Sequence, residues 1–467
     1  MDILDPRMAA FDAVMWGVED DPLLRSVIIL VVTLDKEPDE AELTARLDRM
    51  TRENPKMRQI PVGNPLSLVP PRWETDPNFD LSYHVRWQRL PQRGGGLSNV
   101  LALAEQICEQ DFDQSRPLWE TTLVTGLARG RAAVIVKLHH SITDGVGGLA
   151  LASVLFDFTP EPRTDLPPLK PAPTPHPISL RERLRQAFHY EYSSATERFR
   201  DAAKIGAGFV RDAVRDPFTT AVASTEWAQS AARILAPARA PMSDVMVDRS
   251  LLVAFSVVEV DLADLKAAAR ATKGTINDAF MAAVTGGLRR YHERHGSALD
   301  AVRVNMPINV RRPGETVDGN RWVPARLPIP INISDARARM RQLHPILIQA
   351  RDEPALGVSD LVYRTLSSLP RPITTAIAGS LMKCTDIAAT NVPGPPIPLY
   401  MGGAQVLAMI PFAPKGGAAI NFGLMSYNGT AYIGINCDRA AVPNPDEFTD
   451  CFVSAMDDVV AVGLAPS

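Results

Sequence analysis

The stretch Val134–Gly145 reads Val-Ile-Val-Lys-Leu-His-His-Ser-Ile-Thr-Asp-Gly. Its β-branched and aliphatic beginning predicts a buried strand that ends at two adjacent histidines, His139 and His140. Asp144 and Gly145 follow a short loop, where an aspartate favours capping a helix and a glycine favours a tight turn. Histidine is scarce, with eight in 467 residues, so the pair at the end of a strand points to function.

The two histidines are expected to have different roles. Neighbouring residues of a strand point to opposite faces, so His139 and His140 cannot both face the same small space. A neutral imidazole, with an ordinary pKa of about 6.5, can take a proton from an alcohol or amine that attacks a carbonyl. No third histidine or cysteine stands at a useful spacing, so no metal is expected. From the pair alone, two hydrogen-bonded core histidines remain the structural alternative.

The rest of the chain predicts two mixed α/β halves. Strands are predicted at 26–34, 132–139, 251–260, 301–308, 405–410, 418–425 and 431–435, and helices at 39–52, 97–109, 264–271 and 276–292. A doubly wound parallel sheet is not expected, because the strands cluster without a regular helix after each. No Gly-rich dinucleotide fingerprint follows a strand either.

A proline-rich linker separates the halves. Eight of the 40 prolines fall between residues 159 and 177, where fixed backbone angles and missing amide donors oppose regular structure. We expect an N-terminal half at 1–158, a linker with amphipathic crossover helices at 159–248 and a C-terminal half at 249–467. The segment Leu180–Lys204 has an apolar stripe beside a basic face. It is interpreted as a helix packed on its own protein or, alternatively, as one lying on a membrane.

Composition excludes several classes of protein. The chain is 46% hydrophobic and 22% charged, as in ordinary globular proteins. Its net charge of -4 lacks the basic excess of nucleic-acid-binding proteins, so no nucleic-acid partner is expected. No secretory signal is recognisable and Val27–Val32, the most apolar run, is too short to span a bilayer, so a cytoplasmic protein is expected. The four widely spaced cysteines are expected to be reduced thiols.

Beyond these inferences, His139–Gly145 resembles the His-His-x-x-x-Asp-Gly signature of the coenzyme-A-dependent acyltransferase superfamily. Within it, the chain resembles the bacterial bifunctional wax ester synthase/diacylglycerol acyltransferase family. The stretches that carry this narrower resemblance lie in order along nearly the whole chain: Pro117–Glu120, His139–Gly145, Asn277-Asp278, Met306–Arg311, Gly319-Asn320, Asn391–Pro395 and Ser426–Gly429. The superfamily's Asp-Phe-Gly-Trp-Gly motif is absent, and the stretch most similar to it is Asn421–Leu424.

The resemblance implies an α/β (mixed α+β) fold of two chloramphenicol-acetyltransferase-like halves, with the active site and a tunnel at their interface. It implies that His140 is the catalytic base. It also implies that five other residues give His140 structural support: His139, Asp144, Gly145, Asn277 and Asp278. Asn277 and Asp278 also suit a simple helix cap. Weaker candidates for substrate contact are Trp119, Arg311 and Asn391, for which the alternatives are a packing anchor, a solvated arginine and turn-prone backbone.

The implied reaction moves a long-chain acyl group from acyl-CoA to the hydroxyl of diacylglycerol or of a long-chain alcohol, giving triacylglycerol or a wax ester. Acyl-CoA is then a co-substrate, and no cofactor is implied. Two alternatives stay open: an acyltransferase for another hydroxylated lipid, such as a polyketide-type alcohol, and a non-catalytic protein that binds lipid or acyl-CoA. Contact with a membrane or a lipid droplet is also left open.

Overall fold

The computed structural model describes residues 7–63, 69–91, 94–143, 148, 153–163, 166–175, 179, 181–185, 190, 196, 200, 240–309, 322–351, 359–367 and 369–464. Three of the predicted site residues, Asp144, Gly145 and Arg311, therefore lie outside the described residues. Most of the predicted amphipathic segment Leu180–Lys204 lies outside them as well.

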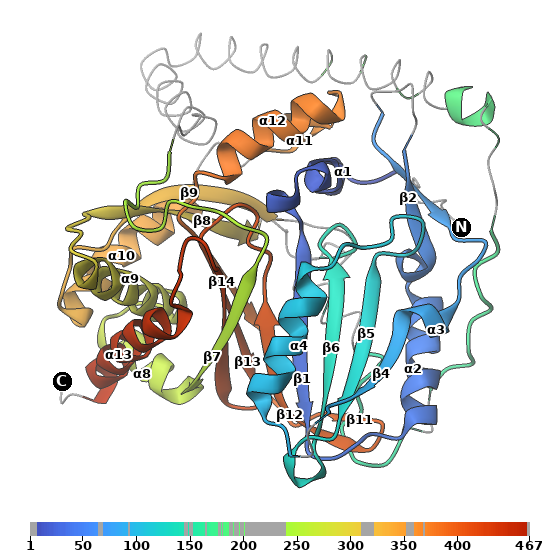
Figure 1. Cartoon of the computed structure of the whole chain (residues 1–467), viewed down its shortest axis with the longest axis horizontal. Coiled ribbons are helices and arrows are strands. Elements are labelled where there is room, and N and C mark those ends of the chain that lie inside the picture. Colours follow the sequence, from blue (N-terminus) through green and yellow to red (C-terminus); the bar gives the residue numbers. More distant parts are fainter. Residues whose placement is uncertain are drawn as a thin grey trace, which may run out of the picture.

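Two six-stranded sheets stand side by side (Figure 1). The first has the order β11-β12-β1-β6-β5-β4, and the second has the order β7-β14-β13-β10-β8-β9. The strands of the first sheet are β1 (Val27–Leu34), β4 (Val85–Arg89), β5 (Trp119–Thr125), β6 (Ala132–His139), β11 (Tyr400–Met401) and β12 (Ala404–Phe412). Those of the second are β7 (Val253–Asp261), β8 (Ala301–Asn309), β9 (Trp322–Pro330), β10 (Ile387–Pro393), β13 (Ile420–Tyr427) and β14 (Thr430–Asp438).

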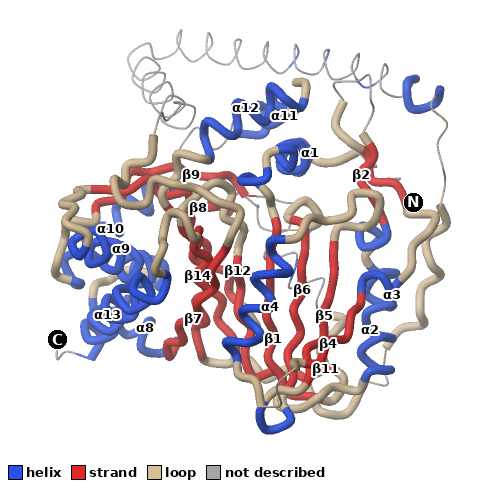
Figure 2. The backbone as a smooth tube through the Cα atoms, in the orientation of Figure 1, coloured by secondary structure: helices blue, strands red, loops and turns tan. Residues whose placement is uncertain are grey.

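Most helices lie beside the sheets, and α1, α11 and α12 lie together at one end of the strands (Figure 2). In the first half these are α1 (Ala10–Gly17), α2 (Glu40–Glu53), α3 (Leu81–His84) and α4 (Leu97–Glu109), with a small hairpin of β2 (Gln59–Val62) and β3 (Arg72–Thr75). In the second, α8 (Leu262–Ala271), α9 (Ile276–Arg294), α10 (Ala336–Arg351) and α13 (Pro445–Leu464) form one helical layer. Helices α11 (Ser359–Leu366) and α12 (Arg371–Met382) lie over α1.

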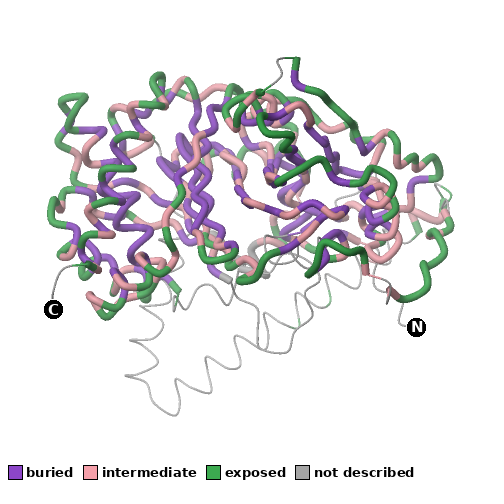
Figure 3. The backbone as a smooth tube through the Cα atoms, turned by 90° about the horizontal axis from the view of Figure 1, so that it is seen from below, coloured by how far each residue is buried: buried purple, intermediate pink, exposed green. Residues whose placement is uncertain are grey.

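The expected mixed fold is confirmed. The pairs β4–β5, β10–β13 and β10–β8 are parallel, whereas the remaining pairs of the two large sheets are antiparallel. A continuous apolar run explains the central strand β1, in which Ile29, Val31 and Leu34 are fully buried. Buried backbone fills the interior of both halves (Figure 3). Among the described residues, no helix is both long enough and apolar enough to cross a membrane.

The second half contributes β11 and β12 to the first sheet. After β10 in the second sheet, the chain crosses to β11 and β12 in the first, where β12 pairs antiparallel with β1 and Phe412 stands opposite Ile29. Asn391–Pro396 spans the end of β10 and the start of this crossing. The proposed boundaries at residues 158 and 249 stay a prediction, since β12 lies in the second half by sequence and in the first sheet by pairing.

Two glycines allow β12 to lie against the second sheet. Gly423 of β13 and Gly434 of β14 stand opposite each other in register. A Cβ atom added at Gly434 would lie 1.9 Å from the carbonyl oxygen of Pro411 on β12, and one added at Gly423 would lie 3.0 Å from the same oxygen. Only a residue without a side chain permits this approach. Next to it, the rings of Phe255 and Phe412 stack with their centroids 4.0 Å apart.

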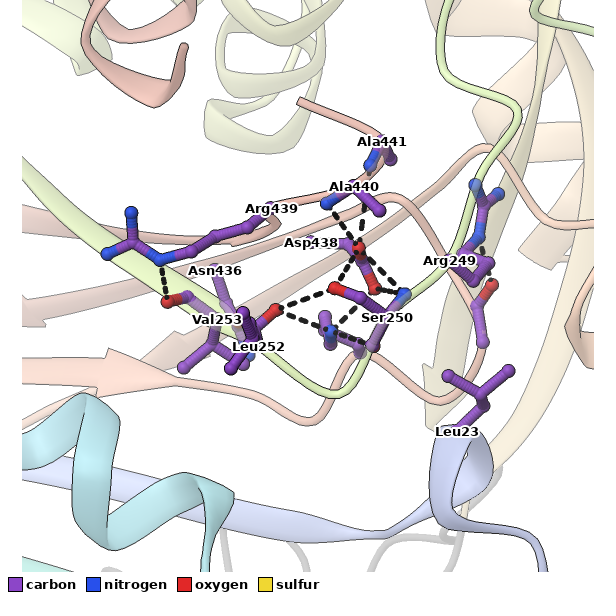
Figure 4. Close-up of polar contacts among 12 residues, drawn as sticks. Leu23, Arg249, Ser250, Leu252, Val253, Asn436, Asp438, Arg439, Ala440 and Ala441 are labelled. Atoms are coloured by element: carbon purple, nitrogen blue, oxygen red, sulfur yellow. Dashed lines mark hydrogen bonds and ion pairs between the residues drawn. The ribbon is translucent and has the colours of Figure 1, made fainter. Parts of the chain in front are cut away.

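The buried carboxylate of Asp438 holds the start of the second half in place through hydrogen bonds. Asp438 at the end of β14 accepts hydrogen bonds from the backbone N–H of Ser250 at 2.8 Å and from its hydroxyl at 2.8 Å (Figure 4). Lys415 Nζ donates to the same carboxylate at 2.6 Å and to the carbonyl of Ser250 at 2.9 Å. Burial raises the pKa of Asp438, but the hydrogen bonds from Lys415 and Ser250 outweigh that effect and hold the pKa below its ordinary value.

Candidate active site

The motif histidines lie at the end of β6, beneath α1. His139 closes the strand opposite Val27 of β1 and is fully buried, whereas His140 begins the turn and is half-buried. The backbone N–H of His140 donates to the carbonyl of Ser26 at 2.9 Å, and that of His139 donates to the carbonyl of Leu118 at 3.0 Å. The two neighbours therefore meet different surroundings, as strand geometry requires.

His139 is held on both sides of its ring. Nδ1 accepts a hydrogen bond from the backbone N–H of Ser141 at 3.1 Å and lies 2.7 Å from the Ser141 hydroxyl. Nε2 lies 3.0 Å from a carboxylate oxygen of Glu19. The rings of Trp16 and Phe112 approach edge-on, with centroids 5.6 Å and 6.2 Å away. These contacts are the ones that a loop-holding histidine needs, and that role stays a prediction.

A cavity of about 260 Å³ opens between the two halves. It is lined by residues of α1, of the β2–β3 hairpin, of the loop before β5, of the α11–α12 connection and of α12: Ala13, Trp16, Gly17, Pro61, Gly63, Val69, Pro71, Gln114, Ser367, Leu369, Pro370, Arg371 and Thr374. Trp16 forms part of this wall and also contacts the ring of His139. The lining combines apolar side chains with polar groups in nearly equal measure, which suits a hydrocarbon chain that carries a polar end.

A buried lysine and a buried histidine pack in the first sheet near the motif. Lys137 is fully buried on β6, donates to the carbonyl of Gln110 at 2.8 Å and places Nζ 4.4 Å from the ring centre of Phe112. Burial lowers its pKa. His84 lies between the rings of Trp119 and Phe79, and burial lowers its pKa too. Both side chains brace the first sheet rather than reach the cavity.

Trp119 is a packing residue in this structure. It is fully buried, stacks on His84 with a centroid distance of 4.6 Å and donates its indole N–H to the carbonyl of Met57 at 2.8 Å. The stretch around it does support the motif, because Trp119 stands opposite Leu138 on the histidine strand. The structure therefore gives Trp119 the contacts of an anchor, and its direct contact with substrate stays a prediction.

Asn277 and Asp278 lie in the first turn of α9, in the helical layer of the second half. Asp278 forms a capping box with Thr275, accepting from its backbone N–H at 2.5 Å, and lies 2.8 Å from Nδ1 of His344. The helix-cap interpretation is confirmed by these contacts. None of the hydrogen bonds that the described residues make to Asp278 comes from the histidine motif, so a supporting role at the site stays a prediction.

The other predicted residues are an exposed asparagine and three residues outside the described part of the chain. Asn391 on β10 is exposed and stands opposite Leu424. Asp144, Gly145 and Arg311 lie outside the described residues. Conversely, sequence reasoning missed Trp16, Glu19 and Arg371, which the fold brings to the motif or its cavity. No spacing or motif signal marks these three, because their partners are distant in sequence.

Comparison with known proteins agrees with this arrangement. Residues 8–280 match the wax ester synthase/diacylglycerol acyltransferase catalytic domain, and residues 318–459 match the C-terminal domain of the same family. A Mycobacterium tuberculosis H37Rv protein that carries the name diacylglycerol O-acyltransferase is 33% identical over 99% of this chain and 94% of its own length. Tgs1 of the same strain, with the same enzyme name, is 28% identical over 92% and 89%.

Solved structures show the same fold. The wax ester synthase/diacylglycerol acyltransferase of Marinobacter aquaeolei VT8 superposes with a TM-score of 0.64 at 20% identity, covering 98% of this chain and all of its own. The starter condensation domain of rhizomide synthetase, solved with C8-CoA, gives 0.58 at 14% identity, covering 99% and 95%. Fold and motif define an acyl-CoA-dependent O-acyltransferase. The chain belongs to the wax ester synthase/diacylglycerol acyltransferase family.

Proposed function

We propose that the protein moves a long-chain acyl group from acyl-CoA to the hydroxyl of diacylglycerol, or of a long-chain alcohol, with His140 as general base. One observation carries the assignment of His140: it is the half-buried histidine of the pair, whereas His139 is fully buried and held on both ring nitrogens. Relatives that carry the name diacylglycerol O-acyltransferase support diacylglycerol as the first acceptor to test.

The chemistry needs one residue for two proton transfers. The imidazole of His140 takes the hydroxyl proton while the oxygen attacks the thioester carbonyl, which gives a tetrahedral intermediate. The intermediate collapses with cleavage of the carbon–sulfur bond, and the imidazolium returns the proton to the departing thiolate. The products are an ester and free CoA. No acyl-enzyme and no cofactor enters this scheme.

Substrate chemistry also suggests where the protein works. Diacylglycerol and long-chain alcohols partition into bilayers and lipid droplets, so we propose a cytoplasmic protein that contacts such a surface peripherally. The apolar side chains in the cavity lining, among them Trp16 and Leu369, support a lipid acceptor. A hydroxylated lipid of another kind, such as a polyketide-type alcohol, would use the same histidine and remains the second candidate acceptor.

The test is thiol release from palmitoyl-CoA with dioleoylglycerol, hexadecanol or no acceptor, with the lipid product identified by chromatography. His140→Ala should lose about 10²- to 10⁴-fold of the acceptor-dependent rate while its circular dichroism stays unchanged. His295→Ala changes an exposed histidine of the second half and serves as the matched control. Near-full activity of a folded His140→Ala variant would contradict the base assignment. Binding of acyl-CoA without release by any acceptor would favour the carrier alternative.

A further inference from the structure

We propose that Glu19 is a positioning residue for the histidine motif. Its carboxylate fixes the tautomer of His139 and, through the backbone of Ser26, the place of His140. The kinetic part of this inference rests on the proposed role of His140 as base, whereas the tautomer does not.

A closed ring of contacts links these residues. Glu19 belongs to the short 3-10 helix Val18–Asp20, and its side chain is 9% exposed. A single oxygen, Oε1, accepts a hydrogen bond from the backbone N–H of Ser26 at 2.6 Å and lies 3.0 Å from Nε2 of His139. The carbonyl of Ser26 in turn accepts from the backbone N–H of His140 at 2.9 Å. The peptide bond between the histidines completes the ring.

This closed set of contacts shows which nitrogen of the His139 imidazole carries the proton. A backbone N–H can only donate, so the bond from Ser141 requires Nδ1 of His139 to be unprotonated. The proton of the neutral imidazole is then on Nε2, which faces the Glu19 carboxylate. The approach is bent rather than linear, so the attraction is mainly between the N–H dipole and the carboxylate charge. Moving the proton to Nδ1 would break the bond to Ser141 and release the turn that carries His140.

The second half holds Glu19 from both sides. Thr375 of α12 donates its hydroxyl to the carbonyl of Gly17 at 3.0 Å, and Arg371 pairs with Asp20 at 2.9 Å. Lys383, next to the end of α12, pairs with Asp21. Val18 and Leu24 pack on Ala378 of α12 in a small buried cluster. The position of the carboxylate is therefore set by a helix that also lines the cavity.

Two substitutions separate positioning from simple stability. Both contacts of Glu19 use the same oxygen, which a glutamine retains as its amide oxygen. Glu19→Gln therefore keeps the hydrogen-bond acceptor and the shape and loses only the charge, whereas Glu19→Ala loses the acceptor. Glu74→Ala is the matched control, because Glu74 is another largely buried glutamate, on β3, that pairs with Arg183 at 2.9 Å.

The kinetic experiment measures kcat and KM for palmitoyl-CoA and dioleoylglycerol in folded variants. Glu19→Ala should lower kcat by about 10- to 100-fold, in the range seen when an orienting partner is removed, with KM changed by less than about threefold. Glu19→Gln keeps the acceptor for the Ser26 N–H but lacks the charge that attracts the Nε2–H of His139, so its kcat should fall between those of wild type and Glu19→Ala. Glu74→Ala should behave as wild type. An unchanged kcat in Glu19→Ala, a loss confined to KM, or a glutamine variant as poor as the alanine variant would overturn the proposal.

A second measurement does not depend on catalysis. In wild-type protein labelled with ¹⁵N-histidine, the long-range ¹⁵N–¹H correlation of His139, assigned by its loss in His139→Gln, should show the Nε2–H tautomer. An Nδ1–H tautomer would overturn the proposal even if acyl transfer is confirmed. The Nε2–H tautomer would support it even if His140→Ala stays active, so the two proposals can fail separately.

Discussion

The carboxylate of Glu105 on α4 accepts a 2.7 Å hydrogen bond from the backbone N–H of Phe255 on β7. Four residues later, Glu109 does the same for Val253 at 2.9 Å. β7 is an edge strand of the second sheet, so these amides have no strand partner. Four residues of a helix and two of a strand both span about 6 Å, which lets glutamates one turn apart serve alternate amides. A helix of one half thereby covers the sheet edge of the other.

Glu105→Ala should lower the free energy of unfolding by about 1 to 3 kcal/mol, because it leaves the Phe255 N–H without its acceptor. Equilibrium unfolding in urea measures the effect. Glu53→Ala, which removes an i,i+4 partner of Arg49 on α2, should cost less than about 0.5 kcal/mol. Equal effects of the two substitutions would show that the edge amide does not depend on the carboxylate.

Gly434→Ala should destabilise the protein strongly, by about 3 kcal/mol or more, because the new methyl group would overlap the Pro411 carbonyl. Gly423→Ala should cost less, since its contact distance to that oxygen is 3.0 Å. Thermal unfolding or soluble yield reports the order. Gly63→Ala is the control, because nothing lies within 4 Å of a Cβ atom there. A stable Gly434→Ala variant would mean that β12 can move away.

Asp438→Asn should destabilise the protein by about 3 kcal/mol at pH 7, because Lys415 then loses its buried partner. The folded-state pKa of Asp438 lies below the ordinary 3.8. Its contribution is therefore fully present above about pH 4 and is lost as the pH falls through the lower folded-state value. Urea unfolding of both proteins at pH 7 and near pH 3 should show the difference shrinking. The exposed Asp450→Asn is the control, and a constant difference would contradict this linkage.

Gly17→Leu should shorten the chain that the enzyme accepts. Gly17 lines the cavity, and a Cβ atom there meets nothing within 4 Å, so the added side chain enters empty space. Rates with long-chain substrates should fall about tenfold or more, while rates with short-chain ones should change little. Ala376→Leu, on the exposed side of α12, should leave the profile unchanged. A uniform loss at all chain lengths would argue that the cavity does not hold the chain.

Local patterns were enough to predict much of the fold. The strand of β6 and the helix of α4 have the predicted bounds, because apolar residues follow a clear period in each. The strand β9 was missed because Pro324, Pro328 and Pro330 interrupt it, and proline argues against a central strand. The structure resolves this conflict by placing β9 at the edge of the second sheet.

The candidate site was predictable only where its signal is local. His139 and His140 are neighbours in sequence, so the motif is visible. Glu19, one of three consecutive acids before β1, meets His139 only after β1 and β6 have paired. No periodicity records such a contact. Trp16 and Arg371 meet at the cavity from opposite ends of the chain for the same reason.

The contribution of β11 and β12 to the first sheet has a consequence for biosynthesis. Until β12 has left the ribosome, the first sheet lacks the neighbour of β1, and the fully buried Ile29 and Val31 lie on an open, apolar edge. The histidine strand is β1's other neighbour. Pairing between strands that are far apart in sequence slows folding and leaves aggregation-prone intermediates. We therefore expect nascent chains that end before Ala404 to bind chaperones or aggregate, and the motif to reach its final geometry only when synthesis is almost complete.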